Sequence, residues 1–290
     1  MPPALVLTTA SKANLTGGAF ADTMVVNAND SLNVITYPLS NPNIAEAFLY
    51  QLWAGDSDSV MEGEIYYTRP DSTHDQINGY RFQVPALTPG GAGNTASFDI
   101  IQGGVQIPVF PNDTATIKVS GSSGDDALVS FLILYNNAPG LGPAQFMSWN
   151  QVQSLRKSNV GIKWGPTASG TAGAYGTGRA INADDNRFHA NSWYALLGLT
   201  VQTQVSTIAF IGPPWGGQRI GMPVGALGLY RSSMWFVDQS IQLNNLPIIP
   251  FFHQADSGNV LGYVADLEAS TTPVVDLNLV ELNGAPVPGQ

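Results

Sequence analysis

The chain has 290 residues, enough for one large or two medium domains, and its lack of cysteine excludes disulfides, thiolate metal sites and a cysteine nucleophile. Charged residues make up only 11% of it, whereas 31 Gly and 20 Pro favour many short elements joined by turns, as in all-β proteins. The net charge of -10 argues against a general nucleic-acid binder, because phosphate contacts need a basic surface.

The N-terminal segment 1–20 is expected to form an arm. Its short apolar run has no basic leader, which argues against a secretory signal. No stretch of the chain approaches the ~20 apolar residues that a membrane-spanning helix needs. We therefore expect a soluble protein or a component of a soluble assembly.

In the first half, apolar residues recur mainly with the period of two that is typical of strands. The alternating runs are 31–39, 63–68, 79–85, 114–120 and 127–135. Two segments have helical spacing instead. The first is 41–55, which ends in Gly55. The second is 142–159, in which apolar residues recur every three positions and two cations fall in the predicted last turn.

The second half begins with residues 165–180, which are rich in Gly, Ala and Thr and are expected to form a loop, a linker or an arm. No Lys-Ser or Lys-Thr pair follows these glycines, which argues against a phosphate-binding loop. Strands are predicted at 192–212, 226–243, 247–252, 259–269 and 273–282. The last strand alternates apolar residues predicted to face inward with Asp276, Asn278 and Glu281, predicted to face outward.

One pattern occurs in both halves. The segment IQGGVQIPVF at 101–110 resembles IQLNNLPIIPF at 241–251. Each half closes with an Asp-bearing predicted strand, an Ile-Pro-x-Phe segment, a middle strand and an alternating strand that ends in Asn. Chance repetition is the alternative, but duplication is the interpretation we prefer. Residues 95–137 and 235–283 should then superpose, with Pro108 and Pro250 at the starts of matching strands.

The predicted fold is all-β, with two β-sandwich or jelly-roll units and a few short helices. The first unit is placed at 21–138 and the second at 191–283. A helix and a Gly-rich linker at 139–190 would join them, and 284–290 would form a C-terminal tail.

Two sandwich units in a weakly charged chain, with many aromatic residues and long Gly- and Pro-rich loops, resemble the jelly-roll major capsid proteins of tailless icosahedral viruses. The resemblance covers residues 21–283. It leaves open a double jelly roll or an upright single jelly roll with a second β domain. It implies a non-enzymatic structural protein, made in the host cytoplasm, that self-assembles into the virion shell of a bacteriophage or similar virus.

The same resemblance implies the partners of the protein. They are further copies in a trimer or pseudo-hexameric capsomer, other capsid proteins, and an internal membrane or packaged genome beneath the shell. No cofactor is implied.

Candidate assembly contacts follow from the charges and the aromatic residues. Segment 127–183 contains no acid, whereas segment 46–75 is strongly acidic. We expect the cations of the acid-free segment to lie on one side and to face an anionic inner layer or the acidic segment of an adjacent subunit. These cations are Arg156, Lys157, Lys163 and Arg179. Trp215 and Trp235 are candidate subunit anchors, with core packing as the alternative.

The alternative function is a two-domain β-sandwich hydrolase or carbohydrate-binding protein that uses Glu62 and Glu64, which share one face of a predicted strand. The interpretation we prefer for this pair is a solvated strand kept from aggregating by its charges. His74, His189 and His253 are isolated in the sequence, so any metal site or Ser-His-Asp set would have to be assembled by the fold.

Overall fold

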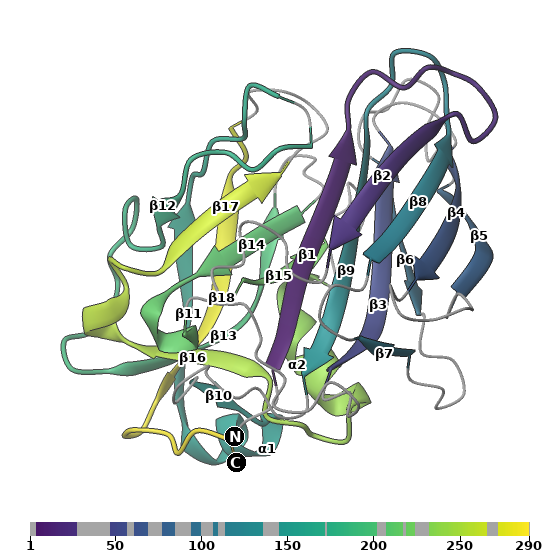
Figure 1. Cartoon of the computed structure of the whole chain (residues 1–290). Coiled ribbons are helices and arrows are strands. Elements are labelled where there is room, and N and C mark those ends of the chain that lie inside the picture. The colour runs from purple at the N-terminus through teal and green to yellow at the C-terminus, as the bar shows by residue number, and fades with distance from the viewer. Residues whose placement is uncertain are drawn as a thin grey trace.

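The structure is a computed structural model that describes residues 4–27, 47–56, 61–68, 77–84, 94–99, 107–109, 114–135, 145–171, 173–201, 207–216, 219–223, 232–265 and 272–289. These residues form mainly antiparallel strands in four sheets, with a few short helices (Figure 1). The predicted all-β fold is confirmed.

The first unit consists of two sheets. One has the strand order β1-β9-β3-β6, with β7 also paired to β3, and the other has the order β2-β8-β4-β5. The strands are β1 (Ala4–Lys12), β2 (Asp22–Asn27), β3 (Ala47–Asp56), β4 (Met61–Thr68), β5 (Ile77–Val84), β6 (Asn94–Asp99), β7 (Ile107–Val109), β8 (Thr114–Ser120) and β9 (Ala127–Tyr135).

The second unit also consists of two sheets. Their strand orders are β10-β16-β13-β18-β11 and β12-β17-β14-β15. The strands are β10 (Phe146–Met147), β11 (Arg156–Trp164), β12 (Arg179–Ala180), β13 (Trp193–Val201), β14 (Thr207–Ile211), β15 (Ile220–Pro223), β16 (Ile249–His253), β17 (Leu261–Ala265) and β18 (Val275–Leu282).

The two units share one topology. The order β1-β9-β3-β7 of the first unit corresponds to β11-β18-β13-β16 of the second, and β2-β8-β4-β5 corresponds to β12-β17-β14-β15. In each unit the counterpart strands also follow one another in the same order along the chain. Two four-stranded antiparallel sheets connected in this way form a jelly roll, so the chain contains two jelly-roll units.

The two prolines that suggested the repeat lie on counterpart strands. Pro108 is the second residue of β7, and Pro250 is the second residue of β16. The match does not extend through the preceding segment, since the strand predicted at 226–243 contains the helix α2 (Trp235–Gln242) instead.

Helix prediction failed at β3, where 41–55 was expected to be helical. Residues 47–56 form a central strand that pairs with β9 on one side and with β6 and β7 on the other, while 41–46 lie outside the described residues. A strand in the middle of a sheet has an almost continuous apolar sequence, which periodicity alone does not distinguish from a helix.

The second predicted helix is shorter than expected. Within 142–159 the helix α1 covers Trp149–Leu155, with Ser148 Oγ accepting a hydrogen bond from Gln151 N at 3.3 Å as its N-cap. Arg156 and Lys157 therefore begin β11 rather than close a helix. Strands β1 and β11 occupy parts of the ranges expected to be an arm and a linker.

The two units pack against each other through β1, which lies beside the second unit in Figure 1. Leu7 N on β1 donates a hydrogen bond to Arg219 O, just before β15, at 2.9 Å. The fully buried Leu7 side chain packs over Gly221 of β15, where an added Cβ would lie 2.4 Å from Leu7 Cδ2. Ser130 on β9 and Thr207 on β14 are buried, with their hydroxyls 3.4 Å apart.

Candidate assembly surfaces and polar clusters

Three of the four predicted contact cations lie on β11, which is at the edge of its sheet in the described part of the chain. Arg156, Lys157 and Lys163 are all exposed. No hydrogen bond or ion pair to the Arg156 side chain is found among the described residues. Lysines and arginines along an edge strand also hinder uncontrolled pairing with other strands.

Lys157 is held by a buried carboxylate. Its Nζ lies 2.7 Å from Glu281 Oε1 on β18, and Glu281 is only 1% exposed. The register between β11 and β18 shifts between Arg156 and Ser158, so that Lys157 and Ser158 both reach the same acid. The sequence placed Glu281 on the outward face, which is wrong.

Four side chains surround the Glu281 carboxylate. Besides Lys157, Ser158 Oγ donates to Oε2 at 2.9 Å and Ser192 Oγ donates to Oε1 at 2.9 Å. His189 Nδ1 lies 3.1 Å from Oε2. The lysine, followed by Ser192, His189 and Ser158, lowers the pKa of Glu281 to about 2, against the opposing effect of burial.

The geometry of this cluster differs from that of a catalytic triad. In a catalytic triad the serine bonds to the histidine, whereas here Ser192 and His189 both turn to the carboxylate. The cluster ties the segment before β13 to β18, helped by Tyr194, whose hydroxyl accepts a hydrogen bond from His189 N at 2.7 Å and whose pKa is raised by burial. The available sequence signal was the spacing of Glu281, which falls two and four residues after the inward-facing Leu279 and Leu277.

Arg179 and Lys163 flank a second acid, Asp184. Arg179 Nε donates to Asp184 Oδ2 at 2.9 Å, and Gly165 N donates to the same oxygen at 2.7 Å. The hydrogen bond from Arg179 lowers the pKa of Asp184, and the charge of Lys163 contributes less. These cations therefore help to fix the loop between β12 and β13.

Both tryptophan candidates are buried. Trp215 is fully buried, and its Nε1 donates to Phe251 O at 3.2 Å, while Trp235 in α2 is 6% exposed. Their burial agrees with the core-packing alternative, and neither indole is available as a surface anchor in this fold.

The carboxylates of the proposed hydrolase, Glu62 and Glu64, lie on the outer face of β4. Glu64 accepts hydrogen bonds from Tyr66 Oη at 3.1 Å and Arg81 Nε at 2.8 Å. Glu62 accepts one from Gln83 Nε2 at 2.6 Å. Cross-strand donors from β5 thus engage both acids, which fits the charged-strand interpretation better than a pair poised for acid and base catalysis.

The histidines are dispersed. His189 contacts Glu281, whereas His253 Nδ1 accepts a hydrogen bond from Ala255 N at 3.3 Å. His74 lies outside the described residues. Within the described ranges, no group of three or more His, Cys, Asp or Glu side chains could hold a metal ion.

A partly open pocket of about 250 Å³ lies between α1, the start of β11 and the segment before α2. Its apolar wall includes Trp149, Val160 and Met234, while Arg156 and Asn159 add polar groups. No described helix has the length and apolar character needed to span a membrane.

No family model and no curated protein matches the chain. Among solved structures, the Tobacco streak virus coat protein is 13% identical, covers 48% of this chain and 90% of its own, and has a TM-score of 0.25. The STIV MCP is 8% identical, covers 96% of each chain and has a TM-score of 0.23. N-glycanase F (PNGase F) is 11% identical, covers 99% of this chain and 98% of its own, and has a TM-score of 0.27.

The structural neighbours thus include viral coat proteins as well as an enzyme. With TM-scores this low, none of these likenesses supports an argument about function.

Proposed function

We propose that the chain is the major capsid protein of an icosahedral virus, a double jelly roll that self-assembles into the virion shell. The observation that carries this proposal is the repeated topology, in which two jelly rolls of one strand order are fused and packed through a buried contact. A chain with two equivalent blocks supplies six of them in a trimer, and six similar blocks can tile a shell.

The composition supports the same role. Only 11% of residues are charged, and burying few charges keeps the desolvation cost of a repeated interface low. In this proposal the subunit is made in the host cytoplasm, needs no cofactor, and joins other capsid proteins over an anionic inner layer of lipid or genome.

Particle formation tests the proposal. The full chain, purified at low concentration, should associate into discrete oligomers as concentration rises, followed by curved patches or shells visible by negative-stain electron microscopy. Light scattering coupled to size exclusion should give masses that are multiples of the protomer.

The proposal fails if the chain stays monomeric at all concentrations and salt conditions. It also fails if the chain hydrolyses a glycan or glycopeptide and the Glu62→Gln/Glu64→Gln variant has lost that activity.

A further inference from the structure

The contact between the two units buries one face of the first unit. Leu5 and Leu7 alternate along β1, opposite Leu134 and Leu132 of β9, and all four side chains are at most 3% exposed. Ser130 lies on the same face of β9 and meets Thr207 of the second unit. The outer face of β1 and β9 is therefore an interface within the chain, and it packs against the β14–β15 side of the second unit.

The counterpart face in the second unit, formed by β11 and β18, is open along β11 and at Asp276, whereas Val280 on the same face is only 1% exposed. Trp164 and Ile162 of β11 face the core, so the alternate residues Asn159, Gly161 and Lys163 face outward, and all three are exposed. Asp276 of β18, opposite Lys163, is exposed as well. The 250 Å³ pocket extends over the start of this face, and Asn278 Nδ2 donates to Ser233 O at 3.1 Å at its border.

The β14–β15 side of the second unit also has a counterpart, the β4–β5 side of the first unit. At the buried contact, the Arg219 guanidinium lies 4.8 Å from the ring centre of Tyr175, a residue shortly before β12. In the first unit, the Arg81 guanidinium on β5 lies 5.3 Å from the ring centre of Phe20, shortly before β2. Strands β5 and β15 correspond, as do β2 and β12, so each unit has an arginine over an aromatic ring near corresponding strands, although Arg219 precedes β15 and Arg81 lies within β5.

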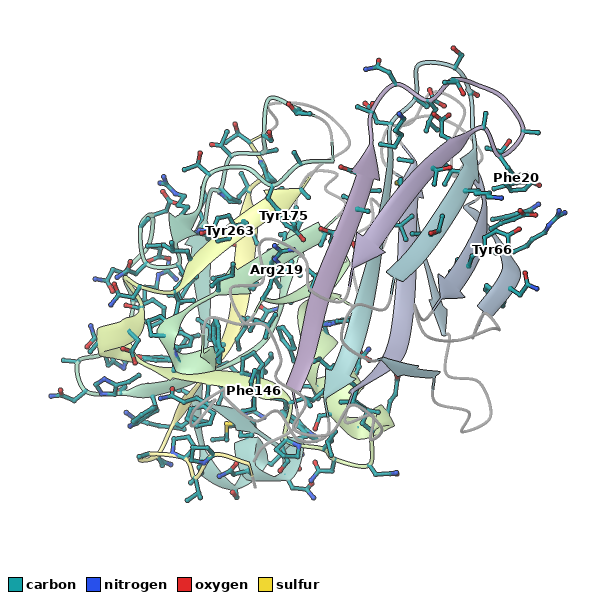
Figure 2. The ribbon with its side chains drawn as sticks, viewed as in Figure 1. Phe20, Tyr66, Phe146, Tyr175, Arg219 and Tyr263 are labelled. Carbon is teal, nitrogen blue, oxygen red and sulfur yellow. The ribbon has the colours of Figure 1, made fainter. Side chains whose placement is uncertain are left out.

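The two pairs differ in their exposure. Arg219 is 1% exposed between the units, whereas the Arg81 side chain is 72% exposed. Figure 2 shows Tyr175 and Arg219 between the two units and Phe20 with Tyr66 on the far side of the first unit. The β14–β15 surface of the second unit is thus covered by the first unit, whereas the corresponding β4–β5 surface of the first unit is exposed. In the same way, the outer face of β1 and β9 is buried between the units, whereas the corresponding face of β11 and β18 is not part of that contact.

We propose that the free pair joins copies of this chain: the outer face of β11 and β18 of one copy docks on the outer face of β4 and β5 of the next, around Arg81 and Phe20. This inference rests on the proposed self-assembly and specifies the surfaces through which neighbouring copies touch. Such a contact is heterologous, so each copy uses both faces, and successive copies form a ring when the rotation between them closes.

The chemistry of the two faces suits an intermolecular contact. The internal interface is lined by leucines, as a permanent contact is, whereas the free face presents Asn159, Lys163 and Asp276 and stays hydrated before assembly. Glu64 is already ion-paired with Arg81 at 2.7 Å, so Glu62 is the acid of the facing surface that Lys163 and Arg156 of the partner would attract.

Gly161 provides a direct test, because an added Cβ there meets nothing within 4 Å and the fold tolerates a side chain. Gly161→Trp should fill the free face and raise the dissociation constant of self-association by at least ~10-fold. Gly258→Trp is the matched control, since Gly258 is also exposed and an added Cβ there meets only Asn182 Nδ2 at 3.8 Å. Equal self-association of the two variants would overturn the proposal.

Cross-linking identifies the partner face. The chain has no cysteine, so cysteines can be introduced singly. A Gly161→Cys chain is mixed with a Gln83→Cys chain, and a bis-maleimide then links the two chains only if positions 161 and 83 lie close together. Covalent dimers should form in this mixture. They should not form with either variant alone, or in a mixture of Gly258→Cys with Gln83→Cys.

The outcomes separate this inference from the proposed function. Shells that assemble without the 161–83 cross-link would overturn the inference and leave the capsid proposal standing. Cross-linked rings that never build shells would support the inference and count against the capsid proposal. A chain that never self-associates would overturn both.

Discussion

Glu281 is the residue whose environment departs furthest from its sequence context. A buried carboxylate is costly unless donors satisfy it, and here lysine, histidine and two serine side chains do so. Its lowered pKa means that folding favours the ionised form. The carboxylate therefore contributes stability above its unfolded pKa, and this contribution is lost as the pH falls from about 4.5 toward about 2.

Replacing this acid tests the cluster. Glu281→Gln should lower the free energy of unfolding by about 2 to 3 kcal/mol at pH 7, because the amide neither pairs with Lys157 nor accepts all four donors. The difference from wild type should shrink between pH 5 and pH 2. Denaturant unfolding at several pH values measures it, with the exposed Asp276→Asn on the same strand as control. A difference that is constant over this range would contradict the ion-pair explanation.

At the scale of elements, β1 and β15 come unusually close because Gly221 has no side chain. An added Cβ would meet Leu7 Cδ2 at 2.4 Å and the backbone oxygen of Ile208 at 2.7 Å. The backbone oxygen belongs to the paired strand β14 and cannot move without disturbing that ladder.

Gly221→Ala should therefore destabilise the protein by about 1 to 3 kcal/mol through overpacking between the units. Thermal unfolding should show a lower Tm, or a separate early transition if the units come apart first. Gly161→Ala, on the open face of the counterpart unit, is the control and should change stability by less than about 0.5 kcal/mol. Equal Tm values for both variants would show that the contact tolerates a methyl group.

Strand β11 combines a protected edge with an exposed outer face. Backbone N–H groups near its end are covered by acids of its own chain, since Lys163 N donates to Asp185 at 3.4 Å and Gly165 N donates to Asp184 at 2.7 Å. Side-chain acids at a strand edge block the addition of a further strand. The strand is therefore protected at its edge, while Asn159, Gly161 and Lys163 on its outer face stay exposed.

At the scale of the whole molecule, charge is distributed unevenly along the chain. The structure separates the cations of the acid-free segment by role: Lys157 and Arg179 hold buried or loop acids, whereas Arg156 is unpaired among the described side chains. Neutralising Lys157 would therefore disturb the fold and confuse any effect on assembly.

A cleaner test of electrostatic steering neutralises Arg156 and Lys163 together. Arg156→Gln/Lys163→Gln should slow assembly more at low salt than at high salt, where screening has already removed the attraction. Lys12→Gln removes a positive charge on β1, away from the proposed contact, and should assemble normally. Light scattering during assembly, from low to high salt, measures both. Identical salt dependence for the two variants would show that net charge alone matters.

The sequence alone determined the fold class and much of the strand placement. The runs 114–120 and 127–135 coincide with β8 and β9, because alternation between turn residues is a local signal that survives in any all-β fold. The repeated Ile-Pro segment likewise predicted counterpart strands, since Pro108 and Pro250 both fall at the second position of equivalent strands.

Tertiary structure alone decided the features that depend on partners distant in the chain. Residues 47–56 became a strand because β6, β7 and β9 pair with them, although their spacing favoured a helix. Glu281 lies on the same face of β18 as the buried Leu277 and Leu279, and a register shift in β11 brings Lys157 to it. The packing of one unit on the other buried Arg219 and left Arg81 exposed. Local patterns carry no information about register or about which face another unit covers, because both are set only when strands far apart in sequence come together.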